Sequence, residues 1–359
     1  MRQRTLSSLI LLMLLLASCA GNKELLLPEK EKDLVESFEM DDKDIEKFKT
    51  IAAPSEITPE EEKKEETPPQ VPIKKKITKK ELKKIEKVVK EKAAEPEVVK
   101  EEPAKEDDYP KDFAKYDAVS SKFWSTFKPR IYEGEKFVFE VSYIGVTAGT
   151  VTLLTLPKVM INNKSHYHFS AELISADYYS YIYALKDRLE SFIEDENFIP
   201  VKYFLIQRES GQKVDDLQIF DHENLKTTFW YKREKKDKDK KEKKEAYIPK
   251  YFQDSFSPLY FMRGFPLRKG DVYEFPVVSR AKYWLLKVSV VGEEEIKVMG
   301  KKINAIKLAA ETHFPGVLKK SGDIHFWYSA DKLRKLLKFS AKVNIGTVEG
   351  TLIDYAEGK

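Results

Sequence analysis

One stretch near the middle of the chain constrains the fold more than any other. Tyr132–Leu156 reads YEGEKFVFEVSYIGVTAGTVTLLTL, and its first half alternates apolar and polar residues. Side chains on a strand point alternately to opposite faces, so this pattern is typical of a strand that buries one face. Gly145 and Gly149 can adopt a positive φ and bracket the predicted turn, after which a second strand begins at Thr150. The inward row of this predicted hairpin is Phe137, Phe139, Val141 and Tyr143, with Lys136, Glu140 and Ser142 facing outward.

The rest of the domain, residues 123–359, is rich in aromatic residues and in short runs of the same kind, such as Ser165–Ile174. Ser255–Arg263 is the one segment predicted as a helix, because a capping residue precedes it and Gly264 ends it. Further strands are predicted at 187–194, 201–209, 217–220, 225–232, 271–279, 283–291, 295–299, 303–311, 322–328, 336–342 and 344–354. Many short strands without alternating helices predict an all-β domain built on a single antiparallel sheet, curved or closed into a barrel or clam shape.

The first eighteen residues are predicted to be a signal peptide. Two arginines precede the apolar run Leu6–Leu16, which is too short for an ordinary membrane-spanning helix. The run ends in Leu-Ala-Ser-Cys, which resembles the lipobox of bacterial lipoproteins, where the cysteine carries the lipid. Cys19 is the only cysteine, which excludes an internal disulfide and argues against an ordinary secretory signal with an incidental thiol. We expect Cys19 to be lipidated. By the same resemblance, Ala20 in place of an aspartate favours the outer membrane of a Gram-negative cell, with the protein facing the periplasm.

Residues 19–122 have a different composition. Charged residues dominate, prolines recur and aromatic residues are nearly absent before Tyr109, so this segment has little apolar surface to bury. Thr78 and Glu81 form a capping box that predicts a lysine- and glutamate-rich helix. The simplest interpretation is a low-complexity tether, disordered or partly helical. About a hundred residues of flexible chain would hold the domain roughly 55 Å from a lipid anchor on average.

Several landmarks along the domain resemble one bacterial envelope family. They are the opening GEKFVFEVSYIGVTAGTVTL, Lys186–Ser191, Asp254–Tyr260 followed by Pro266–Gly270, Lys282–Leu286 and Gly322–Asp331. In this order they are similar to the family called domain of unknown function 3108, over nearly all of residues 132–355. The resemblance implies an exported, β-rich envelope domain and brings no catalytic residues with it. It does not include the tether or the lysine-rich insert at residues 233–244.

Two groups of polar residues are candidates for chemistry. His166 and His168 would share one face of a strand, as a metal site needs, but no third ligand is evident and a polar outer face is the favoured interpretation. Asp187 and Glu190 could be a general acid and base of a polysaccharide-processing enzyme, although Lys186–Ser191 is equally typical of an inter-strand ion-pair ladder. No GxSxG, SxxK or Walker A motif is present, so a hydrolase or nucleotide enzyme has no positive support.

Two further features bear on ligands. The insert REKKDKDKKEKK at residues 233–244 could attract anionic lipopolysaccharide or polysaccharide, but a solvated loop is the simpler prediction. Export and the lack of aromatic residues in the insert argue against nucleic acid. The two segments least like strands hold a surplus of aromatic residues that could line a cavity for an apolar or glycan ligand, or simply close the core. The candidate ligand-binding residues are Tyr178, Tyr179, Tyr181, Phe256 and Tyr260.

Taken together, these patterns favour an outer-membrane-type lipoprotein with a non-enzymatic role. The expected role is to bind a lipid or glycan, or to act in an envelope protein assembly. The net charge of +4 requires no particular partner, and no cofactor is expected. The competing hypothesis is the polysaccharide-processing enzyme.

Overall fold

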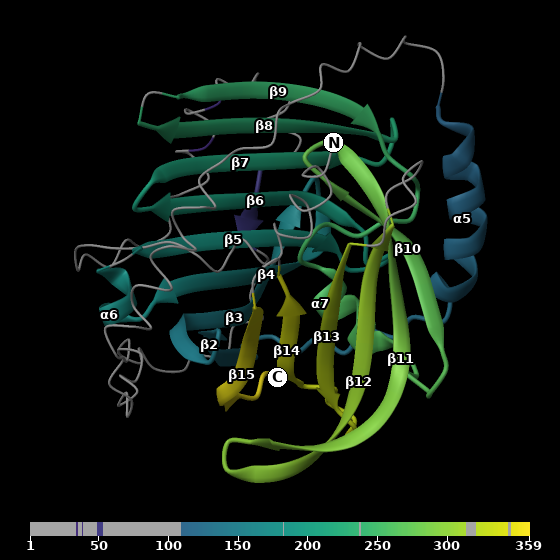
Figure 1. Cartoon of the computed structure of the whole chain (residues 1–359). Helices are drawn as coiled ribbons and strands as arrows, with labels where there is room; N and C mark the ends of the chain where they lie inside the picture. Colours follow the sequence, from purple (N-terminus) through teal and green to yellow (C-terminus); the bar gives the residue numbers. More distant parts are fainter. Residues whose placement is uncertain are drawn as a thin grey trace, which may run out of the picture.

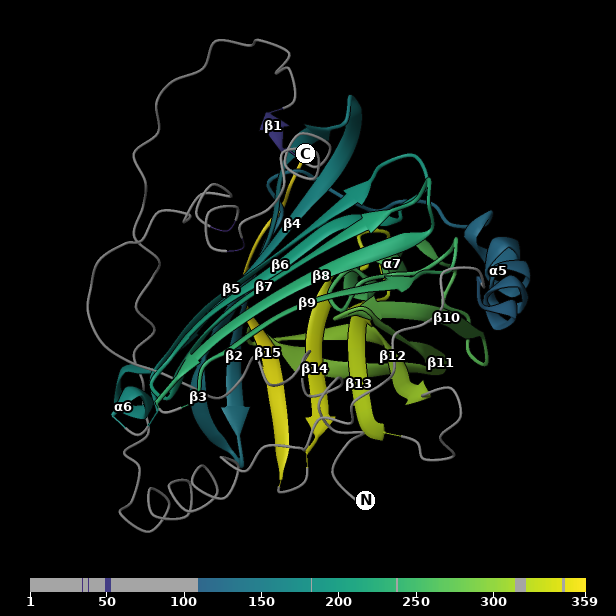
Figure 2. The same cartoon turned by 90° about the horizontal axis from the view of Figure 1, so that it is seen from above.

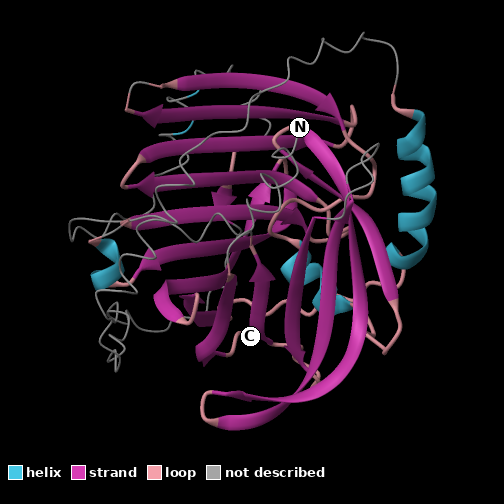
Figure 3. Cartoon of the chain, in the orientation of Figure 1, coloured by secondary structure: helices cyan, strands magenta, loops and turns pink. Residues whose placement is uncertain are grey.

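The computed structural model describes residues 34, 38, 49–52, 109–181, 183–236, 238–313, 321–343 and 346–359. Cys19 and the predicted helix at residues 77–93 lie outside this part of the chain. Strands dominate the described residues (Figure 3). The first of them are β1 (Ile51–Ala52), β2 (Lys136–Tyr143), β3 (Val146–Ile161), β4 (Lys164–Ser175), β5 (Leu185–Glu194), β6 (Pro200–Glu209), β7 (Gln212–Asp221), β8 (Lys226–Lys235) and β9 (Lys240–Tyr247). The others are β10 (Val272–Ser279), β11 (Lys282–Val298), β12 (Lys301–His313), β13 (Ser321–Ser329), β14 (Leu336–Lys342) and β15 (Thr347–Ala356).

All of these strands belong to one antiparallel sheet. Its order is β10 to β15 and then β2 to β9, so the last strand of the chain pairs with the opening hairpin. β1 lies off this path and pairs with β3. The sheet is strongly curved but not closed, since β9 and β10 remain its two edges. Figures 1 and 2 show β10–β15 folded over against β4–β9, with α7 (Pro258–Phe261) between the two parts. The predicted single antiparallel sheet is confirmed.

The opening hairpin has the predicted inward face. Phe137, Phe139, Val141 and Tyr143 are buried, and Phe139 is 0% exposed. The turn is shorter than predicted, because β3 already begins at Val146 and only Ile144 and Gly145 connect the strands. Gly145 has φ +76°, which explains why a glycine is needed there. Gly149 lies within β3, where an added Cβ would come 2.3 Å from the carbonyl oxygen of Ile174.

The concave side of the sheet holds the main hydrophobic core, which we call the inner core. It contains apolar residues from both parts of the sheet, from α7 and from the 3₁₀ helix η2 (Met262–Gly264) that follows it. The helix α5 (Lys111–Trp124) runs beside β10 and adds Trp124. Its Phe113 is 1% exposed and meets the ring of Tyr283 at 4.6 Å. The domain boundary expected at residue 122 therefore falls inside a helix that packs on the sheet.

The convex side of the sheet carries a second, smaller apolar group, which we call the outer cluster. Ten buried residues form it: Leu34, Phe38, Val159, Ile161, Phe192, Phe204, Ile206, Leu217, Ile219 and Trp230. Leu34 and Phe38 come from the segment expected to be a tether, and each is only 4% exposed. β1 attaches to the same region, since Ile51 and Ala52 pair with Met160 and Val159, beyond Leu154, where the pairing of β3 with β2 stops.

Two local predictions differ from the structure. The lysine-rich insert forms the ends of β8 and β9 rather than a loop, and β9 is an edge strand whose lysines alternate across both faces. Charged side chains on an edge oppose pairing with another sheet, which accounts for lysines in a strand. The predicted helix at 255–263 shortens to α7 and η2. Elsewhere, Asp177–Ser180 forms the short helix α6. Among the described residues, no helix has the length and apolar character to cross a membrane.

Candidate functional site

The segment that carries α7 connects the two edge strands and fills the concave side of the sheet. It begins by following the free edge of β10: the backbone of Gln253 donates to Pro276 O at 3.0 Å and accepts from Val278 N at 2.8 Å. It then turns inward and presents α7 to the inner faces of β10–β13. This path places aromatic and aliphatic side chains of a short helix opposite a row of inward-facing strand residues, and a pocket lies between them.

The start of this helical segment is held by Asp254. Its Oδ1 accepts hydrogen bonds from the backbone N–H groups of Phe256 (2.8 Å) and Ser257 (2.7 Å), and its Oδ2 accepts from the hydroxyl of Ser191 on β5. Burial raises the pKa of the Asp254 carboxyl, and these hydrogen bonds oppose the rise. Asp254 therefore fixes the first turn and ties it to the opposite half of the sheet.

The end of the segment is held by a buried ion pair. Arg263 is 1% exposed, and its Nη2 donates to Glu135 Oε1 at 2.8 Å while Nη1 donates to Glu135 Oε2. Arg263 also donates to the backbone oxygen of Leu333, and the hydroxyl of Tyr355 donates to Glu135. A buried charge is tolerated only when it is paired and hydrogen-bonded. The pair therefore locks the α7 segment to the opening hairpin and the last strand.

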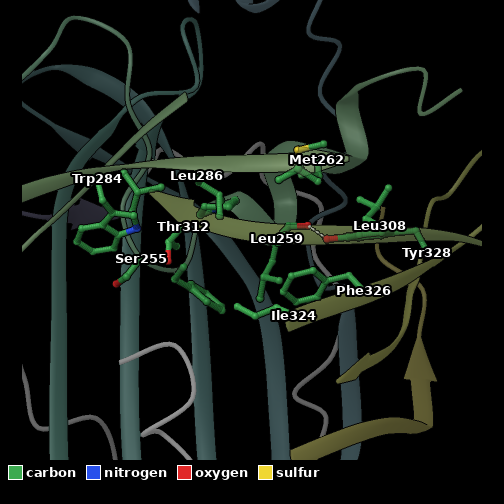
Figure 4. A pocket seen from close by; sticks show the side chains of 15 residues that line it. Ser255, Leu259, Met262, Trp284, Leu286, Leu308, Thr312, Ile324, Phe326 and Tyr328 are labelled. Atoms are coloured by element: carbon green, nitrogen blue, oxygen red, sulfur yellow. Dashed lines mark hydrogen bonds between the residues drawn. The ribbon is translucent and has the colours of Figure 1, made fainter. Parts of the chain in front are cut away.

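Fifteen residues line the pocket between α7 and β10–β13 (Figure 4). Its cavity volume is about 50 Å³, and the unfilled space including its opening is about 590 Å³. The helical side contributes Ser255, Phe256, Pro258, Leu259 and Met262, and the strands contribute Val277, Trp284, Leu286, Val288, Leu308, Ala310, Thr312, Ile324, Phe326 and Tyr328. The hydroxyl of Tyr328 is engaged, because it donates to Leu259 O at 2.9 Å. The wall is apolar, apart from a few hydroxyl groups and the indole N–H.

The predicted aromatic ligand residues do not form one site. Phe256 lines the pocket, whereas Tyr260 faces away from it and stacks on Phe169 with ring centroids 3.9 Å apart. The α6 tyrosines lie at the other end of the domain in both views (Figures 1 and 2). There Tyr179 is buried, Tyr178 donates to Thr147 O, and Tyr181 is 93% exposed.

His166 and His168 do share one face of β4, but it is the outer face. His168 Nε2 lies 2.7 Å from Glu190 Oε2 and its ring stacks on Phe192, with centroids 4.4 Å apart. His166 Nδ1 lies 2.9 Å from Lys164 O, and burial lowers the pKa of His166. No group of three potential metal-binding side chains exists among the described residues. The geometry is that of a polar strand face.

Asp187 and Glu190 lie on opposite faces of β5. Asp187 is on the inner face with Leu189, whereas Glu190 is on the outer face, where it also accepts from Arg188. Burial and the nearby charge of Glu209 raise the pKa of Asp187 to about 8. Although burial opposes it, the hydrogen bond from His168 and the charge of Arg188 lower the pKa of Glu190. Two carboxyl groups separated by the sheet cannot flank one glycosidic bond, as a glycosidase requires.

Sequence reasoning found only one of the pocket residues. The alternation of Trp284, Leu286 and Val288 on β11, and of Leu308, Ala310 and Thr312 on β12, indicated a buried face but not a gap. A pocket forms here because the helical segment that faces these strands is only one turn of α7 plus η2, too short to cover all of them. That shortness depends on the path of the segment along β10, which no local pattern encodes.

A family model described as Protein of unknown function (DUF3108) matches residues 138–353. The chain belongs to this DUF3108 family. The match spans the sheet from β2 to β15, so this DUF3108 domain includes the pocket, Asp254 and Arg263. No curated protein matches the chain.

Three of the solved structures that are similar to this DUF3108 chain illustrate the likeness. A beta-barrel-like protein of domain of unknown function DUF1849 from Brucella abortus is 9% identical, with 65% of this chain and 100% of that chain covered and a TM-score of 0.41. A candidate lipoprotein from Parabacteroides distasonis is 10% identical, with 64% and 99% covered and a TM-score of 0.29. A candidate exported protein with a YmcC-like fold from Bacteroides fragilis is 9% identical, with 64% and 99% covered and a TM-score of 0.29.

Proposed function

We propose that this DUF3108 protein is a lipid-anchored protein of the cell envelope that holds the hydrocarbon part of an amphiphile. The site is the pocket between α7 and β10–β13, and the observation that carries the proposal is its lining. Apolar walls with few polar groups favour alkyl or aryl groups, whose burial is driven by the hydrophobic effect. A glycan would leave many of its hydroxyl groups without partners in such a pocket, which is costly.

The pocket is built to persist without a ligand. Asp254 and Arg263 fix both ends of the α7 segment through buried hydrogen bonds to β5 and to the opening hairpin. A site that is formed in advance loses little conformational entropy when a ligand enters, so more of the contact energy appears as affinity. The half-buried side chains of Leu259, Leu286 and Phe326 lie in the wall and give an entering chain apolar contacts.

Binding can be tested with a dansyl-labelled fatty acid titrated into the purified protein. Leu286→Asp places a carboxylate in the pocket wall and should weaken binding of the probe at least about tenfold, since a buried unpaired charge is strongly disfavoured. Leu285→Asp is the matched control, because Leu285 is also half-buried but points to the other face of β11. If both variants weaken binding equally, or the parent protein binds no probe, the pocket is not the site. Lipid extraction of the natively purified protein followed by mass spectrometry would identify the natural ligand.

The anchoring part of the proposal rests on Cys19, which ends the lipobox-like sequence. Changing Cys19→Ser should move the protein from the membrane fraction to the soluble fraction, because the thioether lipid can no longer form. The measurement is fractionation of cells in high salt, followed by detection of the protein. A variant that still sediments with membranes would show that another feature holds the protein there. Separation of inner and outer membranes would test the expected outer-membrane location.

A further inference from the structure

The outer cluster limits the distance between the domain and a lipid anchor at Cys19, because two of its residues come from early in the chain. Leu34 and Phe38 are buried against the convex face of β3–β8, and β1, which begins 51 − 38 = 13 residues after Phe38, pairs with β3. Lys202 strengthens this attachment, because its ammonium group donates to Thr50 Oγ1 and lies 4.6 Å from the ring centroid of Phe192. We call Leu34, Phe38 and Thr50–Ala52 the strap residues.

We propose that the strap residues hold the convex face of β3–β8 close to the membrane, with the lysine-rich edge at β9 meeting anionic phospholipid headgroups. This inference rests on lipidation of Cys19, as proposed above. It goes beyond that function because it assigns an orientation and a second contact surface. The pocket plays no part in it.

The number of residues between Cys19 and the strap residues supports a position of the domain close to the membrane. From Cys19 to Leu34 there are 34 − 19 = 15 residues, which can span at most about 50 Å. Without the strap residues, the chain would first meet the domain near Tyr109, after 109 − 19 = 90 residues, which can span up to about 300 Å. For a flexible linker, effective concentration falls roughly as the −3/2 power of its length, so a sixfold shorter linker should raise it at the membrane by about fifteenfold.

The place where the chain enters the domain supports the orientation. Both buried strap side chains belong to the outer cluster, so the first described residue after Cys19, Leu34, lies on the convex face. Figure 2 shows β1 on the side of β4–β8 that is opposite to β10–β13. A segment of 15 residues is too short to pass easily around the molecule. The lipid anchor at Cys19 should therefore hold the convex face toward the bilayer.

Charge on the adjoining edge suits an anionic surface. Residues 232–245 contain nine lysines and arginines and five acidic residues, a net charge of 9 − 5 = +4. Lys243 projects from β9 on the convex side, where its ammonium group lies 5.2 Å from the ring centroid of Trp230. Trp230 is itself in the outer cluster, so this basic edge directly adjoins the strap. Clustered basic residues next to a membrane anchor bind anionic lipids in a salt-dependent manner.

The test uses the full lipidated protein in vesicles that contain phosphatidylglycerol and a trace of lipid with a maleimide headgroup. Lys243→Cys places a thiol at the basic edge, and Lys301→Cys is the matched control on the exposed tip of the β11–β12 hairpin. Figure 1 shows this hairpin at the end of the molecule opposite to β9. The thiol at 243 should couple to the lipid about tenfold faster than the thiol at 301, because coupling depends on effective concentration at the membrane.

Two variants test whether the strap residues and the length of the segment before them set the coupling rate at 243. Adding Leu34→Asp and Phe38→Asp should slow coupling at 243 toward the rate at 301. Inserting thirty Gly/Ser residues between 21 and 33 leaves the strap residues unchanged. It lengthens the segment between Cys19 and Leu34 threefold, from 15 to 45 residues, and should slow coupling at 243 about fivefold. Replacing phosphatidylglycerol by phosphatidylcholine should also slow coupling at 243, most strongly at low salt.

Each failure has a distinct outcome. Equal coupling at 243 and 301 in the parent protein would overturn the proposed orientation. Unchanged coupling in both the double aspartate variant and the Gly/Ser insertion variant would overturn it as well. A protein that does not remain with the vesicles during flotation in high salt would contradict lipidation at Cys19 instead. Equal rates on both lipids would remove the headgroup contact from the proposal.

Discussion

Both faces of β3–β8 carry buried apolar residues, but these are covered in different ways. The concave face packs against α7, η2 and β10–β13, all of which belong to the family-matched domain. The convex face is covered in part by Leu34 and Phe38, which lie about a hundred residues before the hairpin in the chain. The inner core is therefore covered by elements of the matched domain itself, whereas the outer cluster is covered in part by two residues from outside that domain. The comparison predicts different responses to the same type of substitution.

The largest difference is expected between two phenylalanines. Phe139→Ala leaves a cavity that the inner core cannot close, and should lower the free energy of unfolding by about 3–5 kcal/mol. Phe38→Ala should lower it by only about 1.5–3 kcal/mol, because water can replace the lost side chain. Urea unfolding followed by tryptophan fluorescence measures both. Equal losses of unfolding free energy in the two variants would mean that Phe38 contributes as much to stability as a residue of the inner core.

Truncation tests the same contrast at the level of segments. A chain starting at residue 109 loses the strap residues but keeps α5, and it should still melt in one cooperative transition. A chain starting at residue 122 also loses Phe113, which is 1% exposed, and should be further destabilised by about 3 kcal/mol or more. Calorimetry of the two shortened chains and the mature protein gives the comparison. If both shortened chains melt at the same temperature, α5 contributes nothing to the core.

The convex cover also explains what could be predicted from the sequence. Period-2 alternation gave the correct inward row on β2, because one face of that strand is only partly covered. β6 contains the unbroken run Tyr203–Ile206, whose residues are all buried, since Phe204 and Ile206 enter the outer cluster. Such a run is typical of a strand covered on both faces, but it does not reveal what the second cover is.

The candidate site was predictable only in part, for a related reason. Gly264 marked the end of the helical segment correctly, because chain reversal is a local property, whereas the helix begins at Pro258, three residues later than predicted. Arg263 and Glu135 are 128 residues apart, and no spacing rule joins them. The pocket depends on how far α7 reaches across β10–β13, which is set by contacts distant in sequence. The α5 helix was missed because charged residues dominate its first turns and the apolar stripe is thin.

Two glycines of the opening hairpin allow a finer test of the inner face. Gly149→Val should cost about 1–3 kcal/mol, because its Cβ would meet the carbonyl oxygen of Ile174 and force β3 and β4 apart. Gly145→Val should cost about 1–2 kcal/mol through its positive φ alone, since nothing lies within 4 Å of the added Cβ. Gly145→Asn should recover most of the second loss, because asparagine tolerates this conformation. Denaturant unfolding of the three variants decides between crowding and backbone strain.

The last comparison concerns two carboxyl groups that face opposite sides of β5. The pKa of Asp187 is raised to about 8 in the folded protein, against about 3.9 in an unfolded chain. The folded state therefore keeps a proton that the unfolded state loses. The stability that this group contributes is fully present below about pH 4 and is lost as the pH rises to about 8. Asp187→Asn cannot ionise, so its stability relative to the parent protein should increase over that range.

Glu190 should show the opposite sign. The pKa of its carboxyl is lowered in the folded protein by His168 and Arg188, so its contribution is present above the unfolded pKa and is lost as the pH falls. Glu190→Gln should therefore become less stable relative to the parent protein as the pH rises through about 4.3. Thermal melts from pH 3.5 to 9 of the parent and both variants measure the two differences. Parallel curves for the two variants would mean that both carboxyl groups occupy the same environment, and the assignment of Asp187 to the inner face and Glu190 to the outer face would be wrong.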